Sequence, residues 1–211
     1  MMITKFGHSC LLVEEEGVRV LFDPGDWTIE QNTVERLDAI CITHEHGDHC
    51  SIPSLQEIRK KNPNATIYTN SGVGNKLSDA EIPWTLLEDG MEVTVQGLSI
   101  CAYGKEHAEI YETLPRPHNT GYLVGGRLFH PGDSVAVFPP VPIDTLALPV
   151  VAPWLKTSEA IQYARHVKPR LCFPIHDALS VGDTFQKHPR NILPAFGIQV
   201  IDLELGVPCS I

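Results

Sequence analysis

Short apolar segments separated by turn residues open the chain. Alternating apolar and polar residues predict strands at 2–6 and 10–15, and a Glu16-Gly17 turn leads into a third strand at 18–22. That strand runs into Asp23-Pro24-Gly25, whose proline and glycine are strong turn signals. The first part of the chain is therefore predicted to form three consecutive short strands.

Strands and helices alternate after this opening. Residues 39–43 are apolar and β-branched and predict a buried strand, and Ser51-Ile52-Pro53 predicts the start of a helix that ends before Asn62-Pro63. Further along, the pattern predicts strands at 66–69, 91–95, 98–103, 120–124, 127–130, 144–150, 171–175 and 198–205, and helices at 71–80 and 158–167, the last with Ser158 as its N-cap.

This order of elements predicts a single α/β domain spanning residues 1–211. Strands cluster early and helices alternate with strands in each half, a pattern typical of two sheets packed together with helices outside. A length of 211 residues fits one domain. Hydrophobic residues make up 43% of the chain, which is enough for a sizeable core.

Composition limits the binding partners and the cellular compartment that we expect for this protein. No apolar run approaches the roughly 20 residues that span a bilayer, and no basic segment with a long apolar one opens the chain. The six cysteines are scattered and form no C-x-x-C pair, which indicates reduced thiols. We therefore expect a cytoplasmic protein without a membrane partner. A formal charge of -10 disfavours nucleic acid as a partner, whereas a homo-oligomer is compatible with the sequence.

The segment His-Glu-His-Gly-Asp-His follows the predicted strand at 39–43. It contains four candidate metal ligands: His44, His46, Asp48 and His49. The two histidines that alternate at its start point to the same side of an extended loop, whereas the aspartate and the histidine after the glycine bend can point elsewhere. Imidazole and carboxylate groups suit zinc, manganese or iron, so this loop predicts ligands for two neighbouring metal ions.

Four ligands cannot complete two coordination spheres, so further ligands must come from elsewhere in the chain. Three ligand-capable residues, His107, Asp133 and His176, each follow a predicted strand. Open sheets place their sites at the carboxyl ends of strands. These three residues are therefore the expected additional ligands.

Together, H-x-H-x-D-H, a later histidine, a Gly-Asp after a strand and a late histidine resemble the pattern of the metallo-β-lactamase superfamily. The segments GHSCLL, FDPG, HPGDS and PIHD are similar to those of the branch that contains ascorbate-6-phosphate lactonase. The resemblance covers nearly the whole chain and implies a four-layer αββα sandwich of the metallo-β-lactamase type. It also implies the ligand sets: His44, His46 and His107 for one metal, Asp48, His49 and His176 for the other, and Asp133 bridging both.

Two further histidines bear on this assignment. His118 competes with His107 as the third ligand of the first metal, and we favour His107 because it directly follows a predicted strand. The resemblance places His8 at the mouth of the metal pocket. There it could donate a hydrogen bond to the substrate or act as an acid, and a structural role is the alternative.

Other residues near the motifs have open roles. Asp23, at the end of a predicted strand, could accept a hydrogen bond from a ligand histidine and so orient its ring. His130 either supports the ligands or faces the substrate. Trp154 and Tyr111 could contribute to a pocket wall, although such aromatic residues more often simply pack.

The expected cofactors are two divalent metal ions, with zinc as the first choice and manganese, iron or nickel as alternatives. Coordination lowers the pKa of water from roughly 15.7 towards about 7, which supplies a hydroxide nucleophile at neutral pH. Asp48 and Asp133 are placed to anchor that hydroxide, and Asp48, His8 or a metal-bound water could protonate the leaving group. The sequence therefore predicts a metal-dependent hydrolase that acts on a small-molecule ester, lactone or phosphoester.

Two other functions compete with this interpretation. The superfamily includes RNA-processing nucleases, which usually carry a basic surface or a substrate-gripping arm, whereas this chain is acidic and shows no evident insertion. A non-catalytic metal-binding or sensor protein is the other alternative. The complete ligand set argues against it, because a degenerate relative would be expected to lose some ligands.

Overall fold

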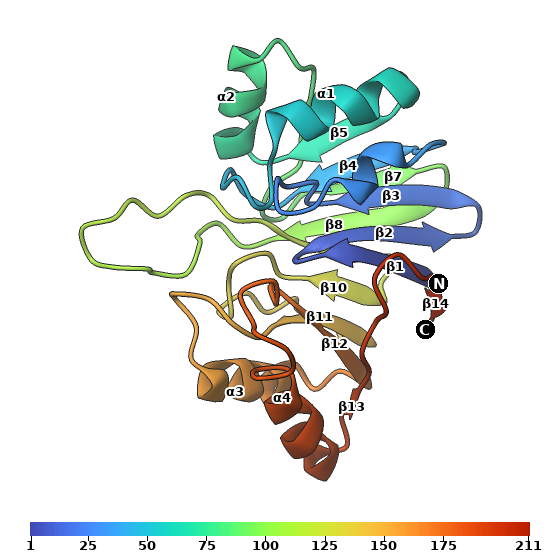
Figure 1. Cartoon of the computed structure of the whole chain (residues 1–211). Coiled ribbons are helices and arrows are strands. Elements are labelled where there is room, and N and C mark those ends of the chain that lie inside the picture. The colour runs from blue at the N-terminus through green and yellow to red at the C-terminus, as the bar shows by residue number, and fades with distance from the viewer.

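The first sheet begins with the three short strands that the sequence predicts. β1 (Met2–Gly7), β2 (Cys10–Glu15) and β3 (Val18–Phe22) pair antiparallel. The computed structural model describes residues 1–211, and its first sheet has the order β14-β1-β2-β3-β4-β5-β6 (Figure 1). The other members are β4 (Ala39–Ile42), β5 (Thr66–Thr69) and β6 (Thr85–Leu86), which pair parallel, and β14 (Cys209–Ser210), which pairs antiparallel with β1.

The second sheet has the order β13-β12-β11-β10-β9-β8-β7. Strands β7 to β10 pair antiparallel, as the two predicted hairpins require, and β10 to β13 pair parallel. The strands are β7 (Glu92–Val95), β8 (Leu98–Tyr103), β9 (Gly121–Val124), β10 (Leu128–His130), β11 (Thr145–Pro149), β12 (Leu171–Ile175) and β13 (Gln199–Val200).

The helices cover the outer faces of the two sheets (Figure 1). α1 (Ile52–Lys61) and α2 (Ser71–Asp79) pack on the first sheet, and α3 (Thr157–Val167) and α4 (Lys187–Ile192) lie against the second. Two short 3-10 turns are η1 (Glu30–Thr33) and η2 (Leu193–Phe196). None of these helices has the length and apolar content that a bilayer crossing requires.

Three apolar clusters hold the layers together. The largest lies between the two sheets and includes Phe22, Tyr122 and Phe173. A second cluster, with Leu55, joins the first sheet to α1 and α2, and a third, with Tyr163, joins the second sheet to α3. Burial of these side chains is the main favourable contribution to folding. The arrangement is the expected four-layer αββα sandwich, so the sequence-based prediction of the fold class is confirmed.

Two predicted element boundaries are wrong. α3 begins at Thr157, before Ser158, because the Glu159 side chain accepts the backbone N–H of Lys156 at 2.9 Å and fixes an earlier start. The strand predicted at 198–205 pairs only at Gln199–Val200.

After β13 the chain crosses from the second sheet to the first. The Gly206 N–H donates to the Lys5 carbonyl at 2.8 Å, and β14 then joins the edge of β1. We call residues 201–208 the crossing segment. Its apolar alternation resembles a strand in the sequence, but its backbone pairs with neither sheet along most of its length, and the N- and C-termini end close together (Figure 1).

Asn62 ties the end of α1 to the loop before β4. Its side-chain amide donates to the carbonyls of Val34 and Ile58 at 2.8 and 2.9 Å, and its oxygen accepts the N–H of Leu37 at 2.8 Å. Because Asn62 is buried, loss of its side chain would leave the Leu37 N–H and the Val34 carbonyl without these partners.

We expect Asn62→Ala to lower the free energy of unfolding by about 2–4 kcal/mol, measured by urea denaturation. Asn64→Ala, at an exposed position two residues away, is the matched control and should change stability by less than about 0.5 kcal/mol. Equal effects of the two variants would contradict this role of Asn62.

Candidate metal centre

Each expected ligand lies just after the carboxyl end of a strand. Residues 44–49, the ligand loop, follow β4, and His107, Asp133 and His176 come after β8, β10 and β12. His8 lies in the tight turn between β1 and β2. The side chains of His8, His44, His49, His107, Asp133 and His176 are all buried, and those of His46 and Asp48 are partly exposed.

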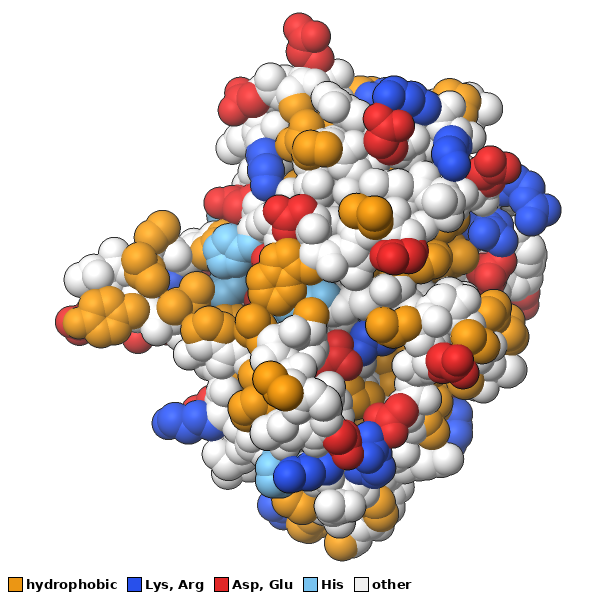
Figure 2. Space-filling view, viewed as in Figure 1, with side chains coloured by type: hydrophobic (Ala, Val, Ile, Leu, Met, Phe, Trp, Pro, Cys, Tyr) orange, Lys and Arg blue, Asp and Glu red, His pale blue; other side chains and the backbone are white.

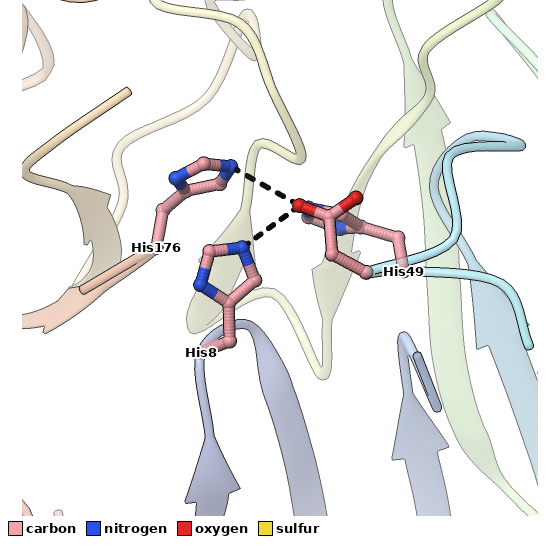
Figure 3. A group of neighbouring side chains, drawn as sticks. His8, His49 and His176 are labelled. Atoms are coloured by element: carbon pink, nitrogen blue, oxygen red, sulfur yellow. Dashed lines mark hydrogen bonds and ion pairs between the residues drawn. The ribbon is translucent and has the colours of Figure 1, made fainter. Parts of the chain in front are cut away.

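These residues form two groups, each of which could hold a metal ion. One group is His44, His46, His107 and Asp133, and the other is His8, Asp48, His49 and His176. Within each group the potential ligand atoms lie within 4.8 Å of one another. Figure 3 shows His8 and His176 turned toward one carboxylate beside His49. Oδ2 of Asp48 lies 3.0 Å from Nε2 of His8 and 3.7 Å from Nε2 of His176.

Asp133 reaches both groups. Its Oδ1 atom lies 3.2 Å from Nε2 of His49, and its Oδ2 atom lies 3.0 Å from Nε2 of His176 and 3.3 Å from Nε2 of His107. A carboxylate in this position is able to contact a cation in either group. The bridging role that the resemblance implies for Asp133 stays a prediction.

Hydrogen bonds on the outer side of the rings fix which nitrogen faces the centre. Nδ1 of His107 donates to the Ala108 carbonyl at 2.6 Å, and Nδ1 of His176 donates to the Val151 carbonyl at 2.7 Å. A carbonyl can only accept, so each ring carries a proton on Nδ1 and turns Nε2 inward. Metal-binding histidines are commonly oriented in this way.

Asp23 and Thr43 orient two ligand-loop histidines. The Asp23 carboxylate accepts from Nδ1 of His49 at 2.7 Å and from the backbone N–H and hydroxyl of Thr43, both at 2.8 Å. Since the Thr43 hydroxyl proton goes to Asp23, its oxygen accepts from Nδ1 of His44 at 3.1 Å. Nε2 of both histidines therefore faces the centre, and Asp23 has the supporting position expected for it.

The turn that contains Asp23 also braces the backbone of the ligand loop. The Asp26 N–H donates to the Gly47 carbonyl at 2.9 Å, and the Ser51 N–H donates to the Pro24 carbonyl at 3.2 Å. Gly25 lies so close to the carbonyl of Asp48 that a Cβ atom there would collide with it. The FDPG segment and the ligand loop are therefore packed backbone against backbone.

Left-handed backbone conformations occur at three non-glycine residues of the site. φ is 47° at His8, 46° at Asp23 and 56° at His176. Such conformations are sterically unfavourable for residues with a Cβ atom, and they persist where the surrounding structure holds them. At the ends of β1, β3 and β12 these conformations set the direction in which the three side chains leave the backbone.

Several buried polar atoms of the centre have no hydrogen-bond partner. They are Nδ1 of His8, Nε2 of His49, His107 and His176, and Oδ1 of Asp133. Some lie near one another, but without the geometry of a hydrogen bond. Leaving buried polar atoms unpaired is unfavourable, and divalent cations would satisfy the Nε2 atoms of His49, His107 and His176 and the Asp133 carboxylate together. The residues present therefore fit a pair of metal ions.

Burial and hydrogen bonding hold several of these groups in the form that binds metal. Burial lowers the pKa of His44 well below its ordinary value and also lowers the pKa values of His46 and His8. Burial would raise the pKa of Asp48, but the hydrogen bond from His8 and the charge of His49 override it and bring the pKa to about 2. Neutral imidazole and ionised carboxylate are the forms that coordinate metal ions.

Asp133 has the opposite effect on two of the histidines. Burial alone would lower the pKa of His49 and of His176, but the charge of Asp133 raises both, and Asp23 adds to the effect on His49. In the metal-free protein the two rings therefore favour the protonated form, and their positive charge faces the Asp133 carboxylate. Metal ions would have to displace these protons, which links binding to pH.

The structure separates His107 from His118. Nε2 of His107 lies in the first group, whereas His118 is exposed and its Nδ1 is 3.1 Å from the Ser71 hydroxyl.

His130 is buried, with Nε2 donating to the Ser9 carbonyl at 3.1 Å and Nδ1 accepting the Gly132 N–H at 3.1 Å. It therefore shapes the turn that carries Asp133.

Trp154 does more than line a wall. Its indole N–H donates to Oδ2 of Asp133 at 3.2 Å, and its ring lies 5.7 Å from the rings of both His107 and His176. Nothing in the sequence pairs a tryptophan in the loop after β11 with this aspartate.

Tyr111 is 58% exposed and belongs to the long segment between β8 and β9, which extends from the body of the molecule (Figure 1).

We expect His107→Ala to lower the metal content of the purified chain, because it removes one nitrogen from the first group. His118→Ala is the matched control and should keep the content of the unchanged protein. Elemental analysis after dialysis against trace zinc measures both, and circular dichroism checks the fold. A normal metal content in His107→Ala, or a loss confined to His118→Ala, would overturn the assignment.

Asp23→Asn should weaken metal binding by about 10–100-fold, because it removes the carboxylate that orients His49. Competition with a chelating dye measures the affinity. Asp79→Asn, at an exposed position on α2, should bind as the unchanged chain does. Unaltered affinity in Asp23→Asn would mean that the ring of His49 is held by packing alone.

Comparison with known proteins agrees with the geometry. The chain is 40% identical to protein Rv0786c of Mycobacterium tuberculosis over 188 residues, which cover 87% of each chain. It is 26% identical to a UPF0173 metal-dependent hydrolase of Carboxydothermus hydrogenoformans, with 83% of this chain and 84% of that protein covered. A solved structure from Parabacteroides distasonis, provisionally named a metal-dependent hydrolase, has 25% identity and a TM-score of 0.79, covering 96% of this chain and 92% of that one.

The match to a family is more extensive than the metal motif. Residues 2–176 match the family described as the Beta-lactamase superfamily domain. This range includes every ligand candidate, from the ligand loop to His176, and all but the last part of the two-sheet core. By fold, site and sequence, the chain belongs to the beta-lactamase superfamily domain family.

Proposed function

We propose that this protein is a metal-dependent hydrolase that acts on a small-molecule ester, lactone or phosphoester. The observation that carries the proposal is the convergence of inward-facing Nε2 atoms and two carboxylates, several of them buried without hydrogen-bond partners. Proteins that match most of the chain are named metal-dependent hydrolases, which supports the same reaction class. Lactones are included because GHSCLL, HPGDS and PIHD are similar to the lactonase branch of the superfamily.

The proposed ligand sets follow the two groups. His44, His46 and His107 would hold one divalent cation, and Asp48, His49 and His176 the other, with Asp133 between them. Zinc is our first choice, since imidazole and carboxylate are its common ligands, and manganese, iron and nickel are alternatives. Bound cations would supply an activated water as nucleophile and offset the charge that develops on the scissile oxygen.

The chain's own residues would position the reaction. The Trp154 indole holds Asp133 in place, and Nε2 of His8 donates to Asp48 at 3.0 Å. His8 and Asp48 lie together at the part of the centre where Asp48 is partly exposed. We propose that this pair accepts the proton that the nucleophilic water releases and passes it to the leaving group, because a proton carrier must lie within hydrogen-bond reach of the reacting atoms.

Access to the centre is through a partly apolar mouth. Trp27 is 45% exposed, and its ring lies 4.4 Å from that of His8. Figure 2 shows histidine side chains on one face of the molecule beside large apolar side chains, with little basic surface around them. A surface of this kind favours a small organic substrate over a polyanion, because the phosphates of a polyanion need lysine and arginine contacts.

The test is a panel containing a carboxylic ester, a lactone, a thioester, a phosphodiester and a structured RNA, offered to the zinc- or manganese-loaded chain. We expect turnover of one small-molecule class, removed by a chelator and restored by metal. His46→Ala should fall to the background rate, because it lacks a proposed ligand. His166→Ala, on the exposed side of α3, is the matched control and should keep its kcat/KM.

Two outcomes would contradict the proposal. Cleavage of the RNA without turnover of any small molecule would indicate a nuclease. Stoichiometric metal binding without turnover of any member of the panel would indicate a metal-binding or sensor protein.

A further inference from the structure

A cavity of about 630 Å³ adjoins the candidate metal centre. Its walls come from four parts of the chain: the end of β1 with Phe6, the loop with Trp27, the segment after β12 with Asp177, and the crossing segment with Leu203 and Leu205. Figure 2 shows a hollow on the same face as the histidines, bordered by apolar side chains and a few charged ones.

His8 connects the cavity to the metal centre. Its ring lines the cavity, while its Nε2 atom lies 3.0 Å from Asp48. The ring of His8 lies 4.4 Å from that of Trp27 and 4.0 Å from that of His176. A substrate whose scissile bond lies beside Asp48 could therefore extend a group past His8 into the cavity.

Apolar side chains are exposed on two sides of the cavity. Trp27 is 45% exposed and Leu205 is 60% exposed, and a molecule bound in the cavity could cover the apolar surface of both. Covering apolar surface is favourable by about 25 cal/mol per Å². Ligand pockets are typically lined in this way, with a few polar groups for orientation.

The charges of the cavity do not suit an anion. Its only lysine, Lys5, is buried, and the ammonium group donates to the Pro174 carbonyl at 2.8 Å and to Asp177 at 2.6 Å. Glu30 and Asp177 supply two carboxylates against this one ammonium group. A phosphate or carboxylate here would find no free cation and would face excess negative charge.

Much of the cavity wall lies outside the family match. The match ends at residue 176, whereas Asp177, Leu203 and Leu205 come after it. The crossing segment reaches the cavity because its backbone bonds to Lys5 instead of continuing the second sheet. This part of the wall therefore lies beyond the segment that carries the metal ligands.

We propose that this cavity binds an uncharged, predominantly apolar group of the substrate, such as a medium-length alkyl chain or an aryl ring on one side of the scissile bond. This inference rests on the proposed hydrolase function and names its substrate class. It predicts esters or lactones with an apolar substituent as substrates, and it disfavours phosphorylated sugars. Leu203, Leu205 and Trp27 are the residues that select the substituent.

The first experiment compares methyl acetate with methyl octanoate and octyl acetate, which carry the same chain on either side of the ester, using acid release by the zinc-loaded chain. At least one octyl compound should have a KM lower than that of methyl acetate by roughly tenfold or more. Placing a carboxylate at the far end of the better chain should remove the advantage. Equal KM values, or a preference for the charged compound, would overturn the proposal.

The second experiment changes the wall. Leu205→Ala should raise the KM for the octyl substrate by roughly fivefold to tenfold, which is more than it changes the KM for methyl acetate. Leu86→Ala, at an exposed leucine of β6 away from the cavity, is the matched control and should change none of these values. Equal effects of the two variants on the octyl substrate would contradict the role of the wall.

Binding of octanamide, measured by calorimetry, separates this inference from the proposed function. If octanamide binds and Leu205→Ala weakens it while no ester is hydrolysed, the hydrolase proposal fails and the cavity remains a site for apolar groups. If esters are hydrolysed without regard to chain length and octanamide does not bind, the cavity inference fails and the hydrolase proposal stands. Neither binding nor turnover would overturn both.

Discussion

The contact of the buried Asp133 carboxylate with the ring nitrogens around it is the interaction on which the rest of the site depends. A carboxylate in the interior is very unfavourable unless positive charge and hydrogen bonds compensate it. Three histidine rings approach it within 3.3 Å, Trp154 donates to it, and its backbone N–H donates to Asn119. Strands of both sheets end beside Asp133. The residues that follow these strands therefore come from distant parts of the chain and together compensate its charge.

The sequence predicts the parts of the site that strands and short motifs determine. The ligand loop follows an apolar β-branched strand, and Asp133 and His176 follow two others, so the rule that sites gather at the carboxyl ends of strands is sufficient to expect them together. The choice of His107 over His118 is less secure from sequence, because both lie near the same loop. The structure brings His107 into the first group, since that residue leaves β8 toward the centre, whereas His118 lies at the exposed edge near α2.

Other features depend on contacts that no periodicity encodes. The Trp154 bond to Asp133 joins two loops 21 residues apart. The crossing segment has the apolar alternation of a strand, yet a single backbone bond from Gly206 to Lys5 turns it toward the first sheet. That departure from the predicted strand creates one wall of the cavity. The least predictable part of the fold is thus also the part that we propose selects the substrate.

The central claim is that this chain holds two divalent cations at the carboxyl ends of the strands of its two sheets. Native mass spectrometry of the unchanged chain, after reconstitution with zinc and removal of excess metal, tests it most directly. The account predicts a dominant species carrying two zinc ions per chain, and a single-ion species at lower zinc. A chain that stays metal-free, or takes up zinc without reaching a defined stoichiometry, would contradict it.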